Sequence, residues 1–441
     1  MTISTLPYGG SLPETWEATP LKYLAALMNG YVFNSADRTD VGTPIIRIEN
    51  LNGSQNFNYS DGALPGRYRV YSGDLLFSWS GNPGTSFGPY LWAEPGEYYL
   101  NQHIFKMRVS GCDTRWLYWS LRAATHWIER ELTSGMIGMV HVTKEELAAV
   151  PIPVPPVESQ RRIADFLDAE TARIDRLADL RRLQLLRLEE RVYAAVSETL
   201  VPGILGPPRS SGPWPWLPAM ASDRPLVRLG YVCRLQSGLT IDSKRDLSGD
   251  VVTRPYLRVA NVQAGHVDLD SVVEVTVPRD IANRTSLRPG DVLMTEGGDL
   301  DKLGRGTVWL GELPDCLHQN HVFALRPEPD RLDGDYLALM TRTLHGRCYF
   351  ESTGSKTTNL ASTNSSKIMS FPIPLPGVAT QRALVTEVQT VIDSSQSAKR
   401  LLERQLALLA ERRQALITAA VTGQFDVSTA SGRNVTEGTT G

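Results

Sequence analysis

The sequence contains little of what marks a secreted, membrane-bound or zinc-binding protein. Its 441 residues include only four cysteines, scattered without a Cys-x-x-Cys pair, which argues against a disulfide framework and a cysteine-based zinc site. No apolar run approaches the roughly 20 residues that cross a bilayer. Residues 1–10 lack the basic start and apolar core of a signal peptide. We therefore expect a cytoplasmic protein with reduced thiols.

Motifs for enzymatic chemistry are also missing. The chain has no His-Glu-x-x-His zinc motif, and residues 354–357, Gly-Ser-Lys-Thr, lack the glycine spacing and the Gly-Lys pair of a phosphate-binding loop. The Asn/Asp-Pro-Pro-Tyr/Phe signature of an amino-methyltransferase is absent, and so is its glycine-rich cofactor loop. We expect a chain without catalytic activity, cofactor or metal. A net charge of −3 also means that any DNA binding would need help from partners, because stand-alone DNA binders are usually basic.

The sequence is instead organised by an internal duplication. Residues 150–155, Val-Pro-Ile-Pro-Val-Pro, run into Gln160-Arg161 and a long helical pattern, and residues 371–376, Phe-Pro-Ile-Pro-Leu-Pro, run into Gln381-Arg382 and another. Proline fixes φ and lacks an N–H, so each Pro-Ile-Pro segment is predicted to be an extended strap between a globular unit and a helix. Earlier landmarks recur in the same order, which chance would rarely produce: 44–50 with 255–261, 72–76 with 289–293, 101–105 with 319–323, and 133–135 with 352–354.

Residue patterns distinguish the globular units from the helices. In the first unit, apolar or alternating runs punctuated by turn residues predict strands over 44–48, 74–79 and 104–109, and helical spacing predicts a helix over 116–132. Residues 158–200 and 380–422 each carry one apolar stripe, including Leu177 in the first, without glycine or proline. Two such stripes in one chain most simply bury each other, as an antiparallel coiled coil.

The predicted fold is therefore α+β, with two α/β units joined by two long antiparallel helices in a pseudo-two-fold duplication. The expected parts are a first unit at 1–155, a long helix at 156–201, a Pro/Gly-rich linker at 202–222, a second unit at 223–376, a second long helix at 377–425 and a disordered tail at 426–441.

This organisation resembles the specificity subunit of a type I restriction-modification system over nearly the whole chain. The most specific features are the duplicated Pro-Ile-Pro-x-Pro…Gln-Arg pattern and the ending at 419–426, Ala-Ala-Val-Thr-Gly-Gln-Phe-Asp. Trp16, Leu21 and Leu24 fit the usual opening of a recognition domain, whereas Trp216 and Leu229 fit it only loosely.

The resemblance implies that each α/β unit is a target recognition domain reading one half of a bipartite, asymmetric target in double-stranded DNA. The helices would act as a spacer and dock two methyltransferase subunits, which bind S-adenosylmethionine and methylate adenine, and motor-nuclease subunits can join them. Deleting one turn, such as 402–405, should then shorten or abolish the recognised spacer. A protein-binding coiled-coil scaffold, such as a defence-system inhibitor, is the alternative. A fused restriction-modification enzyme is disfavoured by the missing motifs.

The duplication also helps to separate candidate base contacts from contacts to the DNA backbone. If the two units read different half-sites, shared features are scaffold or backbone contacts and base readout lies where the units differ. Asn and Gln can bond bidentately to adenine, but a polar turn opening a strand explains the Asn-Gln-His and Gln-Asn-His motifs equally well, with His103 and His321 structural. The candidate contacts are Arg47, Asn50, Arg67, Arg69, Ser78, Trp79, Asn101, Gln102, Arg258, Asn261, Thr295, Glu296, Lys302, Arg305, Gln319, Asn320 and Lys356.

A stronger candidate for base contacts is the position held by Ser78-Trp79 in the first unit and by Thr295-Glu296 in the second. Each pair comes at the end of a shared strand, and the two pairs differ in chemistry. Glu296 can accept a hydrogen bond from cytosine N4, and Trp79 can contact a thymine methyl or simply lie in the core. Basic residues are expected at phosphates or as solvated side chains: Arg47 and Arg258 on matched strands, Arg67 and Arg69 in a loop of the first unit, and Lys302, Arg305 and Lys356 in loops of the second.

Overall fold

A computed structural model describes residues 5–132, 139–206, 226–241, 247–298, 303–356 and 361–427. The chain divides into two compact units. Unit 1 comprises Met1–Arg181 with Arg404–Gly441, and unit 2 comprises Arg182–Glu403. Most of the predicted linker, including Trp216, and nearly all of the predicted tail lie outside the described residues.

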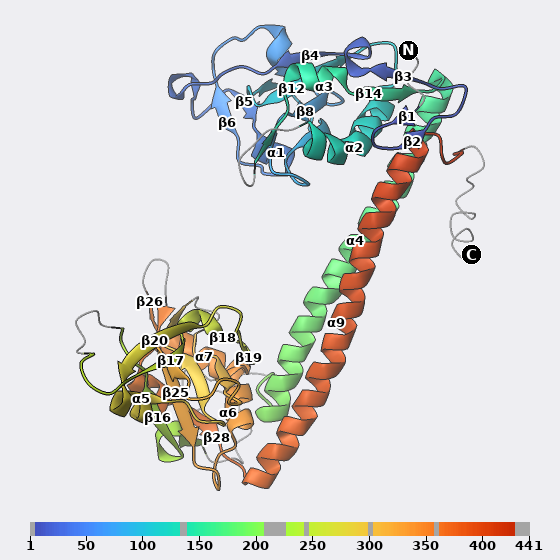
Figure 1. The fold of residues 1–441 in the computed structure, drawn as a ribbon. Coiled ribbons are helices and arrows are strands. Elements are labelled where there is room, and N and C mark those ends of the chain that lie inside the picture. Colours follow the sequence, from blue (N-terminus) through green and yellow to red (C-terminus); the bar gives the residue numbers. More distant parts are fainter. Residues whose placement is uncertain are drawn as a thin grey trace. The chain divides into compact units, whose positions relative to one another are not determined.

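Unit 1 is built on two four-stranded sheets (Figure 1). One has the antiparallel order β10-β8-β12-β4, and the other has the order β6-β5-β11-β7 with β5 and β11 parallel. The helix α2 covers the first sheet and buries Trp116, Leu117, Leu121 and Ile128 in its core. The strands of unit 1 are β1 Thr5–Leu6, β2 Gly10–Ser11, β3 Glu17–Pro20, β4 Ala25–Asn29, β5 Thr43–Ile46, β6 Asn58–Ser60, β7 Arg69–Val70, β8 Leu75–Ser78, β9 Ser80–Gly81, β10 Gly88–Leu91, β11 Tyr98–Leu100, β12 Ile104–Val109, β13 Val140–His141 and β14 Pro151–Val154. Its shorter helices are α1 Ile48–Leu51, α2 Thr114–Glu131 and α3 Lys144–Ala149, with 3-10 turns at Leu21–Tyr23, Ser35–Asp37 and Gly66–Tyr68.

Unit 2 repeats this plan. Its four-stranded sheet has the order β16-β25-β21-β23, and a three-stranded sheet has the order β20-β17-β24 with β17 and β24 parallel. Its strands are β15 Leu226–Arg228, β16 Cys233–Ser237, β17 Val251–Leu257, β18 Val262–Gln263, β19 His266–Val267, β20 Val273–Pro278, β21 Val292–Thr295, β22 Gly297–Gly298, β23 Gly306–Val308, β24 Leu317–His318, β25 Val322–Pro327, β26 Ser355–Lys356, β27 Ala361–Ser362 and β28 Pro372–Pro374. Its shorter helices are α5 Arg279–Thr285, α6 Gly334–Thr341, α7 Leu344–Thr353 and α8 Ser365–Met369, with 3-10 turns at Leu229–Tyr231 and Val259–Asn261.

Strand registers align the two units residue by residue. Ser78 pairs with Ile104 across β8 and β12, and Thr295 pairs with Val322 across β21 and β25. The parallel pairs align Ile46 with Leu100 in unit 1 and Leu257 with His318 in unit 2. Arg47 and Arg258, Trp79 and Glu296, and His103 and His321 are therefore equivalent positions.

Each Pro-Ile-Pro strap is an extended strand, as predicted. The strap β14 pairs with β3 at the start of unit 1, and β28 pairs with β15 at the start of unit 2. The turns that follow β3 and β15 begin at Leu21 and Leu229, and both leucines are fully buried. Leu229 is thus the structural counterpart of Leu21, although its sequence context matches only loosely.

Two helices of 44 residues, α4 Val157–Leu200 and α9 Val378–Val421, pack together (Figure 1). Asp175 bonds to Arg413 within unit 1, and Glu189 bonds to Lys399 within unit 2. Going from Asp175 to Glu189 along α4 therefore corresponds to going back from Arg413 to Lys399 along α9, so the helices are antiparallel, as predicted. Leu177, predicted on the buried stripe of α4, is 41% exposed instead.

One predicted strand is shorter than expected. Its pattern covered 44–48, but β5 ends at Ile46 and α1 begins at Ile48. The cause is local, because the Asn50 side chain accepts a hydrogen bond from the Arg47 N–H at 2.9 Å and turns the chain into a helix. The strand predicted over 104–109 is confirmed residue for residue as β12.

Candidate nucleic-acid interface

The Asn-Gln-His and Gln-Asn-His motifs form the same tight turn in the two units. In unit 1 the Ile104 N–H donates to the Asn101 carbonyl at 3.2 Å, and in unit 2 the Val322 N–H donates to the Gln319 carbonyl at 2.8 Å. The neighbouring parallel strand anchors each turn: the Asn101 N–H donates to Ile46, and the Gln319 N–H to Leu257. We call these segments the recognition turns, residues 101–103 and 319–321.

A glycine holds each recognition turn against the next strand. A Cβ atom on Gly30 would lie 2.1 Å from the Asn101 carbonyl oxygen, and one on Gly238 would lie 2.2 Å from the His318 carbonyl oxygen. Real Cβ atoms do not approach that closely, so both positions require glycine. The sequence reading missed this matched pair, in which Gly30 directly follows β4 and Gly238 directly follows β16.

The residue after β8 or β21 lies beside the histidine of the recognition turn. In unit 1 the Trp79 ring centroid is 5.4 Å from that of His103 and 6.1 Å from that of His141, and the indole N–H donates to the Gln102 carbonyl at 3.0 Å. In unit 2 the Glu296 Oε2 is 2.5 Å from the His321 Nδ1. The same backbone position therefore presents an aromatic ring in one unit and a carboxylate in the other.

The backbone at this position is shared even though the side chains differ. The Trp79 carbonyl accepts a hydrogen bond from Val142 at 3.0 Å, and the Glu296 carbonyl accepts one from Thr363 at 2.7 Å. Ser78 is fully buried and donates its hydroxyl to Ser80, whereas Thr295 is half-buried. Ser78 is therefore turned away from solvent.

A cleft of about 530 Å³ lies next to the recognition turn of unit 1. It brings together three predicted site residues, Arg47, Asn101 and Gln102, with His103. The sequence reading missed the other polar residues of its wall, which are Glu49 of α1 and the loop residues Arg38, Asn52, Asn82, Thr85 and Ser86.

The side-chain amides of the recognition turns are partly hydrogen-bonded within the protein. The Asn101 amide donates to the Gln102 side-chain oxygen at 3.1 Å, and the Gln319 side-chain oxygen accepts from the Val259 N–H at 3.3 Å. Asn320 is half-buried and makes no side-chain hydrogen bond to the described residues. Asn320 and the Gln319 amide nitrogen therefore keep bonding capacity for another molecule.

Asn50 and Asn261 are bound inside the protein. Both are buried, and their side-chain oxygens accept hydrogen bonds from the Arg47 and Arg258 N–H groups. Their amide nitrogens donate to backbone carbonyls, in unit 2 to Asp268 at 2.9 Å and in unit 1 to two residues of one loop. Both asparagines therefore stabilise their own turns through these hydrogen bonds.

Arg47 and Arg258 begin α1 and the matched 3-10 turn. The Arg47 guanidinium pairs with Glu49, and the Arg258 guanidinium donates to the Ser271 carbonyl at 3.2 Å. In both arginines the Nε atom is buried without a hydrogen-bond partner among the described residues. The two side chains thus share a position and an unsatisfied donor.

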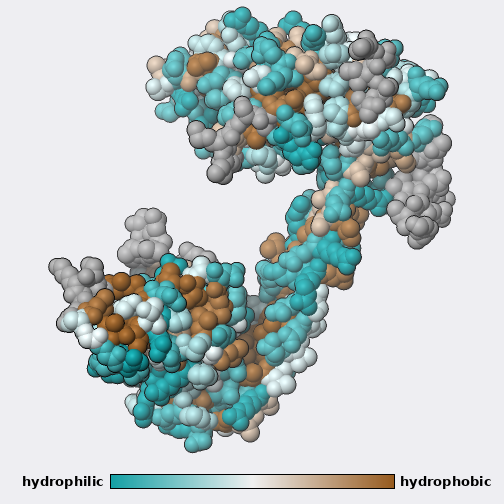
Figure 2. Space-filling view, viewed as in Figure 1, coloured by the Kyte–Doolittle hydropathy of each residue, from teal (hydrophilic) through white to brown (hydrophobic). Residues whose placement is uncertain are grey.

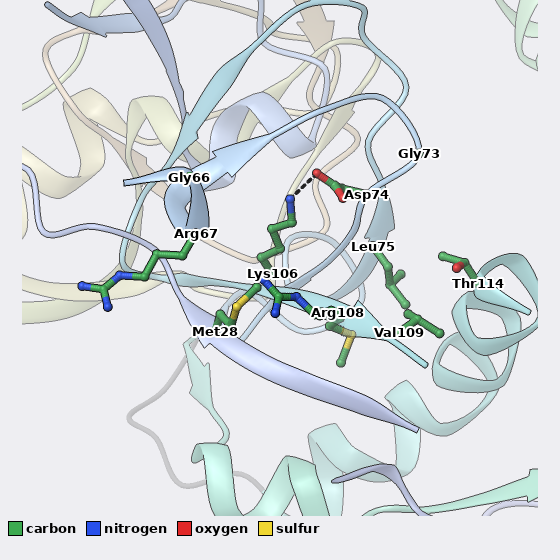
Figure 3. A pocket seen from close by; sticks show the side chains of 11 residues that line it. Met28, Gly66, Arg67, Gly73, Asp74, Leu75, Lys106, Arg108, Val109 and Thr114 are labelled. Atoms are coloured by element: carbon green, nitrogen blue, oxygen red, sulfur yellow. Dashed lines mark hydrogen bonds and ion pairs between the residues drawn. The ribbon is translucent and has the colours of Figure 1, made fainter. Parts of the chain in front are cut away.

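Arg67 lines a second cavity in unit 1, about 320 Å³ in volume (Figure 3). Lys106 reaches Asp74 at 2.6 Å, whereas Arg67 extends away from this pair and lies on the Tyr68 ring. This cavity is at the β8 end that begins with Leu75, opposite the end next to the recognition turn. Arg69 is tied to Glu97 at 3.3 Å, so it is committed to an internal ion pair.

The structure describes only some of the basic residues predicted as DNA contacts in unit 2. Burial lowers the pKa of Arg342, and the positive charge of Arg305 lowers it further. Lys302 lies outside the described residues, and of Lys356 only the backbone, in β26, is described.

The described residues contain no cluster of three or more His, Cys, Asp or Glu side chains arranged to hold a metal ion. Nor do they include a helix long and apolar enough to cross a membrane. All four cysteines are free thiols, and burial raises the pKa of Cys233 and Cys316 to about 12. These cysteines are therefore protonated at neutral pH, as expected for reduced core thiols.

Comparison with known proteins identifies related proteins and a shared fold. Residues 13–184 match the family model of the type I restriction modification DNA specificity domain. The EcoBI specificity subunit of Escherichia coli is 23% identical over 94% of this chain and 87% of its own length. The EcoKI specificity subunit of E. coli K12 is 26% identical over 62% of this chain and 57% of its own.

Solved structures share the architecture of two β-rich domains with two long packed helices. A chain of a type I restriction-modification system, from work on complex assembly and conformational transition, aligns with a TM-score of 0.69 and 20% identity over 94% of this chain and all of its own. The HsdS subunit of Thermoanaerobacter tengcongensis aligns with a TM-score of 0.52 and 19% identity, over 95% of this chain and 99% of its own.

Residues 13–184 therefore carry the DNA specificity domain of type I restriction-modification systems. Over nearly its whole length the chain is similar to specificity subunits of such systems, in sequence and in fold.

Proposed function

We propose that the two units are target recognition domains that each read one half of a split, asymmetric sequence in double-stranded DNA. One observation carries this proposal: an equivalent backbone frame presents Trp79 beside His103 in unit 1 and Glu296 beside His321 in unit 2. A repeated frame with different side chains is what reading two different sequences through one docking geometry requires. The recognition turns and these two positions face the base edges, with Gln102, Gln319 and Asn320 as further readers.

Shared basic side chains supply the phosphate contacts that set register. Arg47 and Arg258 hold equivalent positions, and both side chains are half-buried rather than fully enclosed. Arg305 is a further candidate for a phosphate contact in unit 2. With a net charge of −3, the chain depends on its partners for the remaining positive surface.

The long helices dock two methyltransferase subunits. Four leucines of α4 are exposed where a lone coiled coil would be polar: Leu177, Leu180, Leu183 and Leu186. Figure 2 shows hydrophobic atoms among hydrophilic ones along the surface of these helices. Leu401 and Leu408 are exposed on α9. An exposed apolar stretch on each of the two helices suits two copies of one partner.

The same helices act as the spacer between half-sites. Removing 402–405 together with the facing turn 183–186 shortens both helices by about 6 Å, which corresponds to about two base pairs. The recognised spacer should shorten by that amount or methylation should be lost. A variant with alanine at the same positions keeps helix length and should keep the spacer; a deletion variant with an unchanged spacer would contradict this role.

Genome-wide adenine methylation tests the proposed function. Cells that express this chain with its methyltransferase partner are compared with cells that lack only this chain. A split, asymmetric adenine motif that depends on the chain supports DNA recognition. If the partner is active and bound but no chain-dependent motif appears, the chain is instead a protein-binding scaffold.

A further inference from the structure

The clearest chemical difference between the units lies at the Trp79 and Glu296 positions. The Trp79 ring packs against His103, Phe105 and His141, and its single N–H is already donated to the Gln102 carbonyl. Indole has no acceptor, so this position offers DNA only an apolar edge.

Glu296 offers the opposite chemistry. Its Oε2 is held by the His321 Nδ1 at 2.5 Å, and no described residue bonds to its Oε1. The side chain is 31% exposed, and His321 is 54% exposed. A carboxylate can only accept hydrogen bonds, so Glu296 presents one oriented acceptor to a molecule that covers this surface.

We infer that Glu296, oriented by His321, selects a cytosine in the half-site of unit 2 by accepting a hydrogen bond from its N4 amino group. This inference rests on the proposed function. In the major groove only cytosine and adenine present amino donors, whereas guanine and thymine present the acceptors O6, N7 and O4. Adenine also places its N7 acceptor beside the amino group, where it repels a carboxylate, and cytosine has no such neighbour.

His321 is a positioning residue in this arrangement. The hydrogen bond to its ring fixes one carboxylate oxygen and leaves the other without a partner among the described residues. The Glu296 N–H also donates to the His321 carbonyl at 2.8 Å, so backbone and side chain hold the same geometry. In unit 1 the equivalent histidine packs on Trp79 and has no carboxylate to orient.

The test begins with the methylation motif of the wild-type complex and then compares three variants. Glu296→Gln keeps the size of the side chain but adds a donor. His321→Gln retains a donor for the carboxylate, and His321→Ala removes it. The matched control is Glu274→Gln, which makes the same charge change at an exposed residue of β20 in unit 2.

In the wild-type motif, the half-site of unit 2 must contain a G·C pair. In E296Q, preference for that pair should fall about tenfold to a hundredfold, since one good base contact contributes that much discrimination. The other half-site and the E274Q motif should remain unchanged. H321A should relax the same position, and H321Q should restore part of the preference. Relaxation confined to one base pair is not what a merely structural role of His321 would produce.

Three results would overturn the inference while leaving the proposed function intact: a half-site of unit 2 without a G·C pair, an E296Q motif identical to wild type, or relaxation at another base pair. If E296Q does not methylate, purified wild-type complex is given duplexes in which each C·G pair of that half-site becomes T·A. At one of these pairs the change should weaken DNA binding by the same factor. If no change at any pair weakens binding, the inference is overturned. Absence of any split motif in wild type would contradict the proposed function itself.

Discussion

The side-chain oxygen of Gln160 accepts a hydrogen bond of 2.8 Å from the Asp113 N–H at the start of α2. The Gln160 amide nitrogen donates to the Pro155 carbonyl at 2.8 Å, so one buried side chain joins the strap, α2 and α4. Gln381 does the same in unit 2, where it bonds to the Asp333 N–H and the Pro376 carbonyl. The duplicated Gln-Arg motif thus fixes each globular unit to its helix.

Gln160→Ala should lower the free energy of unfolding of unit 1 by about 2–3 kcal/mol, because it leaves a buried N–H and a carbonyl without partners. Gln381→Ala should do the same to unit 2. Gln389→Ala is the control, since Gln389 is exposed and bonds only along α9 to Asp393; it should change stability by less than about 0.5 kcal/mol. Urea unfolding of the purified chain measures all three. Equal effects of Q160A and Q389A on the free energy of unfolding would contradict the role of Gln160 in fixing unit 1 to α4.

Stability should fall as pH drops below neutrality, because two buried histidines resist protonation. Burial lowers the pKa of His318 to about 4 and that of His345 to about 4. The unfolded chain binds a proton on each near pH 6.5 and the folded chain does not, so each contributes stability that is complete above that pH and lost toward pH 4. By pH 5 the loss is about 2 kcal/mol for each histidine.

Two variants isolate this effect. His318→Asn keeps a donor for the Val322 carbonyl, and His345→Gln keeps one for the Pro372 carbonyl. Each should reduce the change in unfolding free energy between pH 7.5 and pH 5, measured by urea denaturation, while His266→Gln, at an exposed position of β19, should not. A pH dependence that is identical in wild type, H318N and H345Q would show that these histidines are not its source.

Charge on the exposed leucines of α4 should prevent partner docking without unfolding the chain. Leu180→Glu and Leu186→Glu should weaken methyltransferase binding at least about tenfold, because each places a carboxylate in an apolar contact. Leu247→Glu alters an exposed leucine of a unit 2 loop and serves as the control. Co-purification and titration calorimetry measure binding, and urea unfolding checks the fold. Undiminished binding by L180E and L186E would rule out this surface.

Sequence patterns predicted the elements whose determinants are local. Residues 158–200 became α4 nearly to the residue, because a long apolar period without glycine or proline leaves no competing structure. The Pro-Ile-Pro straps followed from proline geometry in the same way. The end of β5 was mispredicted because the Asn50 side chain, which the strand pattern ignores, caps the next turn.

The site depended on contacts that no local pattern records. The duplication identified Trp79 and Glu296 as equivalent positions, but not that His141, about 60 residues later, packs on Trp79. The exposure of Leu177 was missed because the α4 sequence carries more apolar positions than one partner helix can cover. Gln160 was noticed as a motif, and only the fold shows that it binds Asp113 and Pro155.

The most direct test of the central claim is a domain exchange read out by methylation. Residues 1–150 are replaced by the recognition domain of another specificity subunit of known target, and the motif is determined in cells that contain the methyltransferase partner. One half-site should change to that of the donor, and the half-site read by unit 2 should remain as in wild type. A motif in which both halves change, or neither does, would contradict one recognition domain per half-site.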